Sequence, residues 1–231
     1  MMLRALPALL LLLSTASPAE SLQGFYVAGG LMNQQVRAHV QGDEGFDGSQ
    51  VLIDSSSTRY RAGGTLLAGY RFPLGDSGIV MLETGADLNA TNRFSANGTS
   101  LPDNAVESRW KLSRSWFLAF KPGIRLGDDL FAYASFAYHR ADVDFAASVQ
   151  FGGQSNTTRA GSQSIDGIGI GLGLQGPISE RLFIRGEIEG MRFSRALFDI
   201  TPPGGTPDSF VSRHSIRPDA VVGRVVVGYK F

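Results

Sequence analysis

The chain has 231 residues, 29 of them glycine, with aromatic residues at 10% and no cysteine. Its 21 basic residues balance its 21 acidic residues, so the composition does not indicate a polyanionic partner such as a nucleic acid. Without cysteine, an exported chain of this length must be stabilised by its fold and not by disulfide bonds. Beyond the N-terminus no apolar run is as long as a transmembrane helix, so any membrane crossing must be made by strands.

The N-terminal segment has the three parts of a secretory signal peptide. Arg4 supplies the positive charge, residues 6–13 form the apolar run, and the small-residue cleavage site at 17–19 precedes Glu20. The apolar run is too short to cross a bilayer as a helix, and no cysteine follows it for lipid attachment. We therefore predict a cleaved signal peptide at 1–19 and an exported β-barrel domain at 20–231.

Alternation of apolar and polar residues predicts eight β-strands along the rest of the chain. Successive strand residues point to opposite faces, so each strand has one apolar face and one mixed face. In chain order the predicted strands span 24–32, 60–72, 79–90, 110–126, 130–143, 165–176, 181–193 and 220–231. Each has at least the roughly nine residues that a tilted strand needs to cross a bilayer. The segment 130–143 is apolar on both faces, so its facing stays open.

The connections between these strands alternate strictly between long and short. Four long polar segments are predicted as loops, at 33–58, 91–109, 144–164 and 194–215, and three short turns at 73–78, 127–129 and 177–180. An apolar island at 51–53 suggests a strand extension within the first loop. A membrane meander has tight turns at one end and extended loops at the other, whereas a soluble sandwich has no reason to separate them. The pattern predicts an up-and-down antiparallel barrel.

Aromatic residues collect at the ends of the purer apolar faces, which we expect to face lipid. Two interfacial aromatic girdles are predicted, with Phe25, Tyr70, Phe72, Tyr229 and Phe231 at the short-turn end and Tyr60 and Trp110 at the loop end. A soluble lipid-binding barrel would instead turn its apolar face inward and its charges outward.

The combination of a signal peptide, eight amphipathic strands, four long loops and a terminal Gly-Tyr-Lys-Phe resembles the eight-stranded outer-membrane barrels. These include the OmpA transmembrane domain, the OmpX type and the opacity-protein family, whose first strand is similar to residues 24–30 (GFYVAGG). The resemblance implies an all-β, eight-stranded antiparallel up-and-down transmembrane β-barrel in a bacterial outer membrane. Its loops would be extracellular and its termini periplasmic. Because OmpA continues into a peptidoglycan-binding domain while this sequence ends with its last strand, we do not expect cell-wall tethering.

The resemblance also implies partners. Outer-membrane lipids and lipopolysaccharide would surround the barrel, and the β-barrel assembly machinery would insert it. Tyr229 and Phe231 would then form the C-terminal assembly signal.

The mixed faces, turned inward, place charged residues in the lumen. Eight strands leave an interior just wide enough for side chains, and an isolated buried charge costs several kcal/mol or more. We therefore predict that acidic and basic side chains pair across the lumen and plug it. The predicted network comprises Glu83, Asp87, Glu187 and Glu189 with Arg71, Lys121, Arg185 and Arg224. Rim positions facing water are expected for Arg61, Lys111 and Lys230.

Three functions are compatible with this sequence. The first is a structural and surface-interaction role, adhesin-like or shielding, in which the four loops meet a host or surface ligand. The second is a small-solute porin, and the third is an outer-membrane lipid-modifying enzyme using His139 or His214. We expect no catalysis, because His214 and Ser215 are adjacent and would point to opposite faces of a strand. No cofactor or metal site is predicted, since Asp142 and Asp144 alone are weak evidence for calcium.

Overall fold

The computed structural model describes residues 23–46, 49–89, 94–101, 104–126, 130–151, 154–200 and 210–231. Its strands are β1 (Gly24–Phe46), β2 (Ser49–Leu74), β3 (Gly78–Asn89), β4 (Phe94–Leu101), β5 (Asn104–Leu126), β6 (Leu130–Phe151), β7 (Gln154–Pro177), β8 (Leu182–Phe193), β9 (Ala196–Ile200) and β10 (Phe210–Lys230). Within these ranges, no helix is long and apolar enough to span a bilayer.

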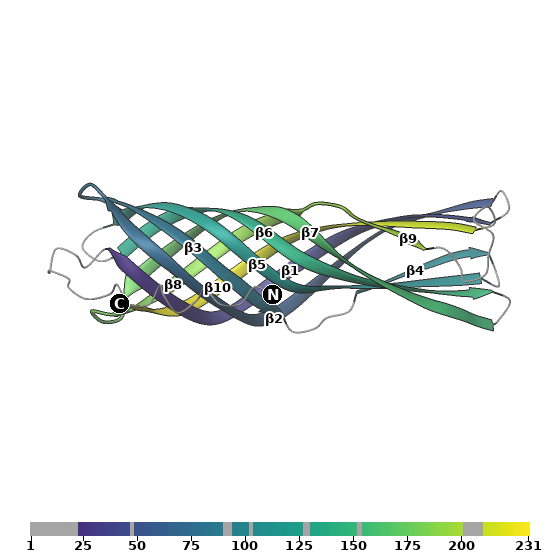
Figure 1. Ribbon diagram of the computed structural model, residues 1–231, viewed down its shortest axis with the longest axis horizontal. Helices are drawn as coiled ribbons and strands as arrows, with labels where there is room; N and C mark the ends of the chain where they lie inside the picture. The colour runs from purple at the N-terminus through teal and green to yellow at the C-terminus, as the bar shows by residue number, and fades with distance from the viewer. Residues whose placement is uncertain are drawn as a thin grey trace, which may run out of the picture.

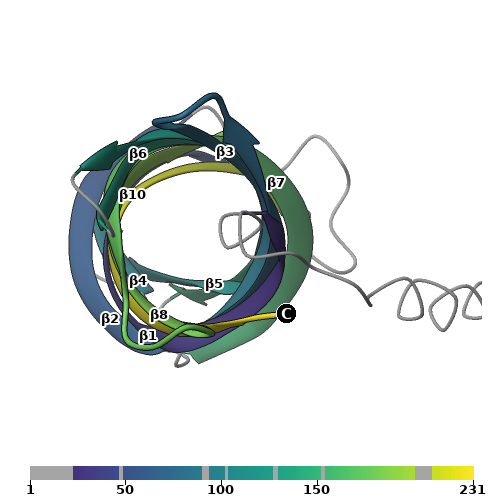
Figure 2. The same cartoon turned by 90° about the vertical axis from the view of Figure 1, so that its left-hand side faces the viewer.

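The strands close into a single antiparallel barrel (Figure 2). The order around the wall is β1, β2, β3, β5, β6, β7, β8 and β10, and β10 pairs with β1 from Tyr26↔Lys230 to Phe46↔Phe210. The short strands β4 and β9 pair with β5 and β10 and follow β3 and β8 along the chain. The wall therefore contains eight transmembrane strands, which confirms the predicted fold class.

The two ends of the barrel differ, as Figure 1 shows, and we call them the tight-turn end and the hairpin end. At the tight-turn end, residues 75–77 join β2 to β3, and Gly75 has a φ of 65°, which glycine adopts without strain. Residues 178–181 join β7 to β8, with the Ile178 nitrogen donating to the Leu182 oxygen at 2.7 Å. The third predicted turn, 127–129, lies outside the described residues.

At the hairpin end, the prediction of four long loops was wrong, because most of these residues are paired strand. β1 and β2 contain 23 and 26 residues and stay in register from Gly24↔Arg71 to Phe46↔Ser49. The apolar island 51–53 lies inside β2, as expected of a strand extension. Polar residues did not end the strands, because the backbone supplies the ladder hydrogen bonds and alternate inward positions remain apolar.

The outer wall carries an apolar belt whose members are exposed large hydrophobic residues. Representative members are Leu31, Leu66, Leu82, Leu118, Phe120, Phe136, Ile170, Leu172, Ile188 and Val225. The structure also settles the facing of β6, since Phe131 and Tyr133 are buried inside while Phe136 and Tyr138 are exposed outside. The belt has the length and polarity of a lipid-facing surface.

Trp110 does not belong to the outer aromatic girdle, in contrast to the prediction. The register of β5 against β6 shifts by one residue between Leu112 and Ser115. This bulge turns Trp110 inward, where its side chain is only 1% exposed, while Trp116 faces outward. The Trp116 ring lies 5.7 Å from that of Tyr138, so this pair occupies the belt's hairpin-side border.

The other predicted girdle residues lie on the outer wall or at its edge. The ring of Tyr70 is 4.6 Å from those of both Phe25 and Phe72, and Tyr229 is 5.2 Å from Phe231, all at the tight-turn end. Tyr60 is exposed toward the hairpin end. Aromatic side chains therefore mark both borders of the belt.

We predict that Gly30→Ala destabilises the closing seam between β1 and β10 by about 1–3 kcal/mol. A Cβ at Gly30 would lie 2.0 Å from the Val225 oxygen and 2.6 Å from the Val226 Cα. These are backbone atoms of β10, so the clash can be relieved only if β1 and β10 move apart. The measurement is the urea midpoint of unfolding for the refolded protein in detergent micelles.

The matched control is Gly223→Ala on the same seam. Gly223 pairs with Asn33 and faces outward, and no atom of the described residues lies within 4 Å of an added Cβ there. The free energy of unfolding of this variant should therefore stay within about 0.5 kcal/mol of wild type. Equal midpoints for the two variants would contradict a closely packed seam at Gly30.

Candidate functional site

Seven of the eight predicted lumen charges meet inside the barrel in one connected cluster, which we call the charge network. They come from four strands because each strand turns alternate residues inward; in β8 every second residue from Phe183 to Phe193 is buried. The members are Glu83 and Asp87 of β3, Lys121 of β5, Arg185, Glu187 and Glu189 of β8, and Arg224 of β10. None is more than 8% exposed.

The Glu83 carboxylate forms the part of the charge network nearest the tight-turn end. Its Oε1 accepts from Lys121 Nζ at 2.5 Å, and its Oε2 accepts from Tyr26 Oη at 2.9 Å and from Arg185. Arg185 also donates to Gln175 Oε1 at 3.0 Å and 3.2 Å. Around the eight-stranded wall, β3 and β8 are four strands apart. The pair between Glu83 and Arg185 therefore spans the full width of the lumen.

Glu187 joins this part of the charge network to the rest. Its Oε2 accepts from Lys121 Nζ at 2.6 Å and from Tyr133 Oη at 2.7 Å, and its Oε1 accepts from Arg224 at 3.1 Å. Both carboxylate oxygens are thus hydrogen-bonded, which is the condition for burying a carboxylate without a large penalty.

Arg224 holds the part of the charge network nearest the hairpin end. Its guanidinium donates to Asp87 at 2.8 Å and 3.3 Å and to Glu189 at 2.5 Å, and it lies 5.2 Å from the centre of the Phe117 ring. Glu189 Oε1 lies 2.7 Å from His139 Nε2. A planar guanidinium suits this position because its five donors can serve several carboxylates at once.

Arg71 is the predicted member that the structure does not join to the network. Its guanidinium lies 5.4 Å from the centre of the Phe131 ring and 5.9 Å from those of Tyr26 and Phe183. No ion pair links it to a carboxylate among the described residues. Arg71 sits nearer the tight-turn end than the acidic residues, so aromatic faces surround it there. With Arg61, which is also buried, the described part of the lumen holds five arginine and lysine side chains to four acidic ones.

Several polar partners of the charge network were not predicted. Tyr26 and Tyr133 donate hydroxyl hydrogen bonds to its carboxylates, and His139 and Gln175 contact Glu189 and Arg185. The inward alternation of β1 and β7 could have indicated Tyr26 and Gln175. For Tyr133 and His139 the facing of β6 had to be known first.

The three rim predictions had different outcomes. Arg61, expected to face water, is 1% exposed and donates to the Leu112 carbonyl oxygen at 2.7 Å. Lys111 faces outward and is half-buried, and Lys230 is half-buried beside the tight-turn end. Leu112 lies at the bulge in β5, where the ladder with β6 is interrupted, and its carbonyl oxygen accepts from Arg61.

Inward glycines of β7 make room for the charge network. A Cβ at Gly169 would lie 2.0 Å from Glu189 Oε1 and 2.8 Å from His139 Nε2, and one at Gly173 would lie 2.2 Å from the Tyr133 ring. The glycine face of this strand therefore lets large polar side chains from β6 and β8 reach across the lumen.

Toward the hairpin end the interior changes from charged to apolar. One cluster of buried residues fills it, which we call the apolar plug: Met32, Val36, Ala38, Val40, Trp110, Leu112, Ala141, Val143, Phe145, Ile165, Met191, Phe193, Ala196, Phe198, Ile216, Ala220 and Val222. The Phe145 and Phe198 rings stack at 4.8 Å, and the His214 ring lies 5.2 Å from Phe145.

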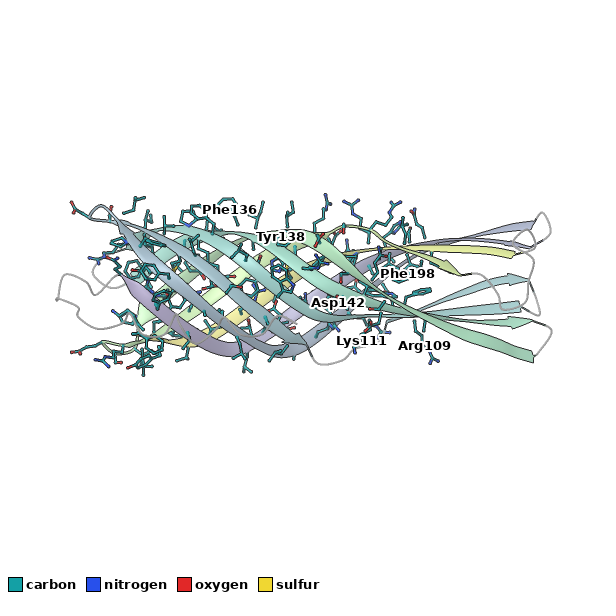
Figure 3. All side chains as sticks on the ribbon, in the orientation of Figure 1. Arg109, Lys111, Phe136, Tyr138, Asp142 and Phe198 are labelled. Carbon is teal, nitrogen blue, oxygen red and sulfur yellow. The ribbon has the colours of Figure 1, made fainter. Side chains whose placement is uncertain are left out.

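The outer wall changes in the opposite sense at the same height. Figure 3 shows Phe136 and Tyr138 on the body of the barrel, whereas Arg109, Lys111 and Asp142 lie farther toward the hairpin end. In the belt the wall is apolar outside and charged inside, and at the apolar plug it is polar outside and apolar inside. This inversion is what the barrel needs if the belt region lies in lipid and the hairpin end lies in water.

Neither histidine of the enzyme hypothesis faces the outer wall. His139 and His214 are both buried inside the barrel, and Ser215 points away from His214 as expected for neighbours in a strand. The carboxylate of Asp142 accepts from Ser164 Oγ at 2.7 Å. Within the described ranges there is no group of three or more metal-ligating side chains.

We predict that Glu187→Ala destabilises the protein by about 3 kcal/mol, the lower end for breaking a buried ion pair. The loss is moderated because Lys121 retains its ion pair with Glu83, and Arg224 retains its ion pair with Asp87. Urea unfolding in micelles measures it, and Glu180→Ala, at an exposed turn carboxylate, is the control that should stay near wild type. If Glu187→Ala changed neither stability nor conductance, the network would not be a plug.

Comparison with known proteins agrees with this geometry. The chain matches the outer membrane protein beta-barrel domain over residues 5–231. Among solved structures, OprG from Pseudomonas aeruginosa is 15% identical, with 90% of this chain and 96% of that chain covered and a TM-score of 0.58, which supports the fold. The outer membrane protease OmpT from Escherichia coli is 8% identical over 94% of this chain and 99% of that chain (TM-score 0.49).

The attachment invasion locus protein Ail of Yersinia pestis is 14% identical over 87% of this chain and 99% of that chain, with a TM-score of 0.39. No curated protein matches the chain in sequence. The family match, however, extends over nearly the whole chain. This protein therefore belongs to the outer membrane β-barrel domain family.

Proposed function

We propose that this outer-membrane barrel has a closed lumen and acts at the cell surface through the β-structure that projects from its hairpin end. The observation that carries the proposal is the filling of the lumen by two successive layers, the charge network and the apolar plug. A solute would have to pass both.

The charge network is a poor channel lining because its charges neutralise one another across the lumen. In a porin, charges line the wall and water separates the two sides. Here Glu83 and Arg185 meet from opposite walls, and Lys121 lies within 2.6 Å of carboxylates from two different strands. Removal of an ion's hydration shell next to paired charges would be costly.

The apolar plug is a second barrier of a different kind. Most of its packed side chains are aromatic or aliphatic, with the buried Arg61 and His214 as polar neighbours, and apolar constrictions exclude ions by dewetting. Phe145 stacked on Phe198, with Trp110 in the same cluster, fills the lumen where a pore would need to be hydrated.

The projection supports a surface role. β1 is longer by about a dozen residues than a membrane-crossing strand needs, which at about 3.4 Å per residue adds roughly 40 Å of strand. The apolar plug gives the base of this projection a core, so it would present its tips at a defined place. We place the hairpin end outside the cell and both chain ends in the periplasm. Adhesion and shielding are both served by such a projection.

Assembly and lipid contact belong to the same proposal. Phe231 is exposed on the outer wall beside Tyr229 at the tight-turn end, where the assembly machinery could bind them as a C-terminal signal. The apolar belt would contact outer-membrane lipids and lipopolysaccharide directly.

We predict that the refolded wild-type protein shows no conducting steps in planar lipid bilayers. A shift in gel mobility between boiled and unboiled samples would first establish that the sample is folded. Discrete ion-conducting steps from the wild type would contradict the proposal and favour a small-solute porin.

The two layers can be separated by substitution. Glu83→Ala combined with Arg185→Ala removes the pair that spans the lumen, and this variant should stay silent because the apolar plug remains. Addition of Trp110→Ala and Phe145→Ala, which removes Trp110 and breaks the stack on Phe198, should produce discrete steps. Conductance from the first variant alone would show that the apolar plug is not a barrier.

A further inference from the structure

The outer wall of the barrel has a groove where β7, β8, β10 and β1 lie side by side. Its volume is about 630 Å³, and its lining includes Ile168, Ile170, Gly190, Arg192, Asp219 and Arg37. The groove lies between two adjacent rows of the ladder, Ile170–Gly190–Val221–Gln35 and Ile168–Arg192–Asp219–Arg37. It therefore crosses the border at which the apolar belt gives way to charged residues.

The belt side of the groove is apolar and lacks side chains at its floor. Among the described residues, the Ile170 oxygen, at 4.0 Å, is the one atom within 4 Å of an added Cβ at Gly190, and no atom lies that near at Gly186 or Gly223. The neighbouring Ile170 and Ile188 are exposed and stand as walls. This depression is apolar and open, as a hydrocarbon chain lying against the barrel would require.

The hairpin side of the groove is cationic. Arg192 Nε lies 3.5 Å from Asp219 Oδ1, with the two side chains 67% and 45% exposed, and Arg37 is exposed directly opposite Asp219 in the ladder. Asp219 lies beside one nitrogen of Arg192 without hydrogen-bonding to it, so the Arg192 guanidinium stays accessible. With Arg217 exposed two residues along β10 and Asp166 exposed two residues along β7, three arginines outnumber two carboxylates around this side of the groove.

We propose that this groove is a binding site for the phosphorylated glycolipid of the outer leaflet, the lipid A portion of lipopolysaccharide. An acyl chain would lie over Gly190 against Ile170, and a sugar phosphate would bind Arg37 and Arg192. Arginine is suited to this role because its planar donors bind phosphate oxygens in pairs. A zwitterionic phospholipid has no net negative charge to match the excess positive charge of the arginines. A second barrel would place the same arginines against its apolar belt.

The test is binding of purified lipid A to the folded protein in detergent micelles, followed by native mass spectrometry. Arg37→Gln combined with Arg192→Gln should weaken binding at least about tenfold, since charge-assisted hydrogen bonds to the phosphate are lost. Gly190→Leu, placed where space is open, should weaken binding comparably by filling the groove while both arginines remain. Heat-dependent gel mobility establishes that each variant is folded.

The matched control is Arg140→Gln. Arg140 is another exposed arginine near the same border, 3.8 Å from Asp166, but it lies on β6 outside the groove. Its substitution should leave lipid A binding unchanged. An equal loss in Arg140→Gln would mean that any surface cation suffices, and equal binding of dephosphorylated lipid A or of phosphatidylethanolamine would mean that phosphate is not recognised. Either result, or no lipid A binding at all, overturns the proposal without bearing on whether the lumen conducts.

Discussion

The pairing of charges across the lumen is the constraint on which this barrel depends. An eight-stranded wall leaves so little interior space that charged side chains from opposite strands meet, and an isolated buried charge costs several kcal/mol or more. The contact between Glu83 and Arg185 satisfies this constraint across the full width, and Glu187 connects it to Arg224. Glycines on the inner face of β7 follow from the same constraint, because larger residues would displace the side chains that do the pairing.

The reversal of polarity along the axis explains why the strands can be so long. Inside the belt, lipid requires apolar residues outside, so the polar residues of each strand turn inward. Beyond the belt, water surrounds the barrel, and the same alternation buries Val143 and Phe145 while Asp142 and Asp144 face outward. The β-ladder continues through both regions because its backbone hydrogen bonds are indifferent to which face is apolar.

Alternation in the sequence was enough to predict the closed antiparallel barrel and all seven charged residues of the charge network. It failed where one residue of register mattered: a bulge in β5 turned Trp110 inward, and a period of two cannot reveal such a shift in advance. It also failed for Arg71, because the face of a residue does not specify its height relative to residues on other strands. The long polar segments looked like loops because their apolar inward positions were sparse among Gly, Ser and Asp.

The apolar plug gives one chain two different sources of stability. Opening of the belt strands within a bilayer would exchange one apolar environment for another, so the hydrophobic effect contributes little to holding them together there. Opening of the plug would expose aromatic and aliphatic surface to water, and this exposure carries a positive heat capacity change. The projecting part should therefore have the curved temperature dependence of a water-soluble domain, including weakening on cooling, while the membrane-embedded part should not.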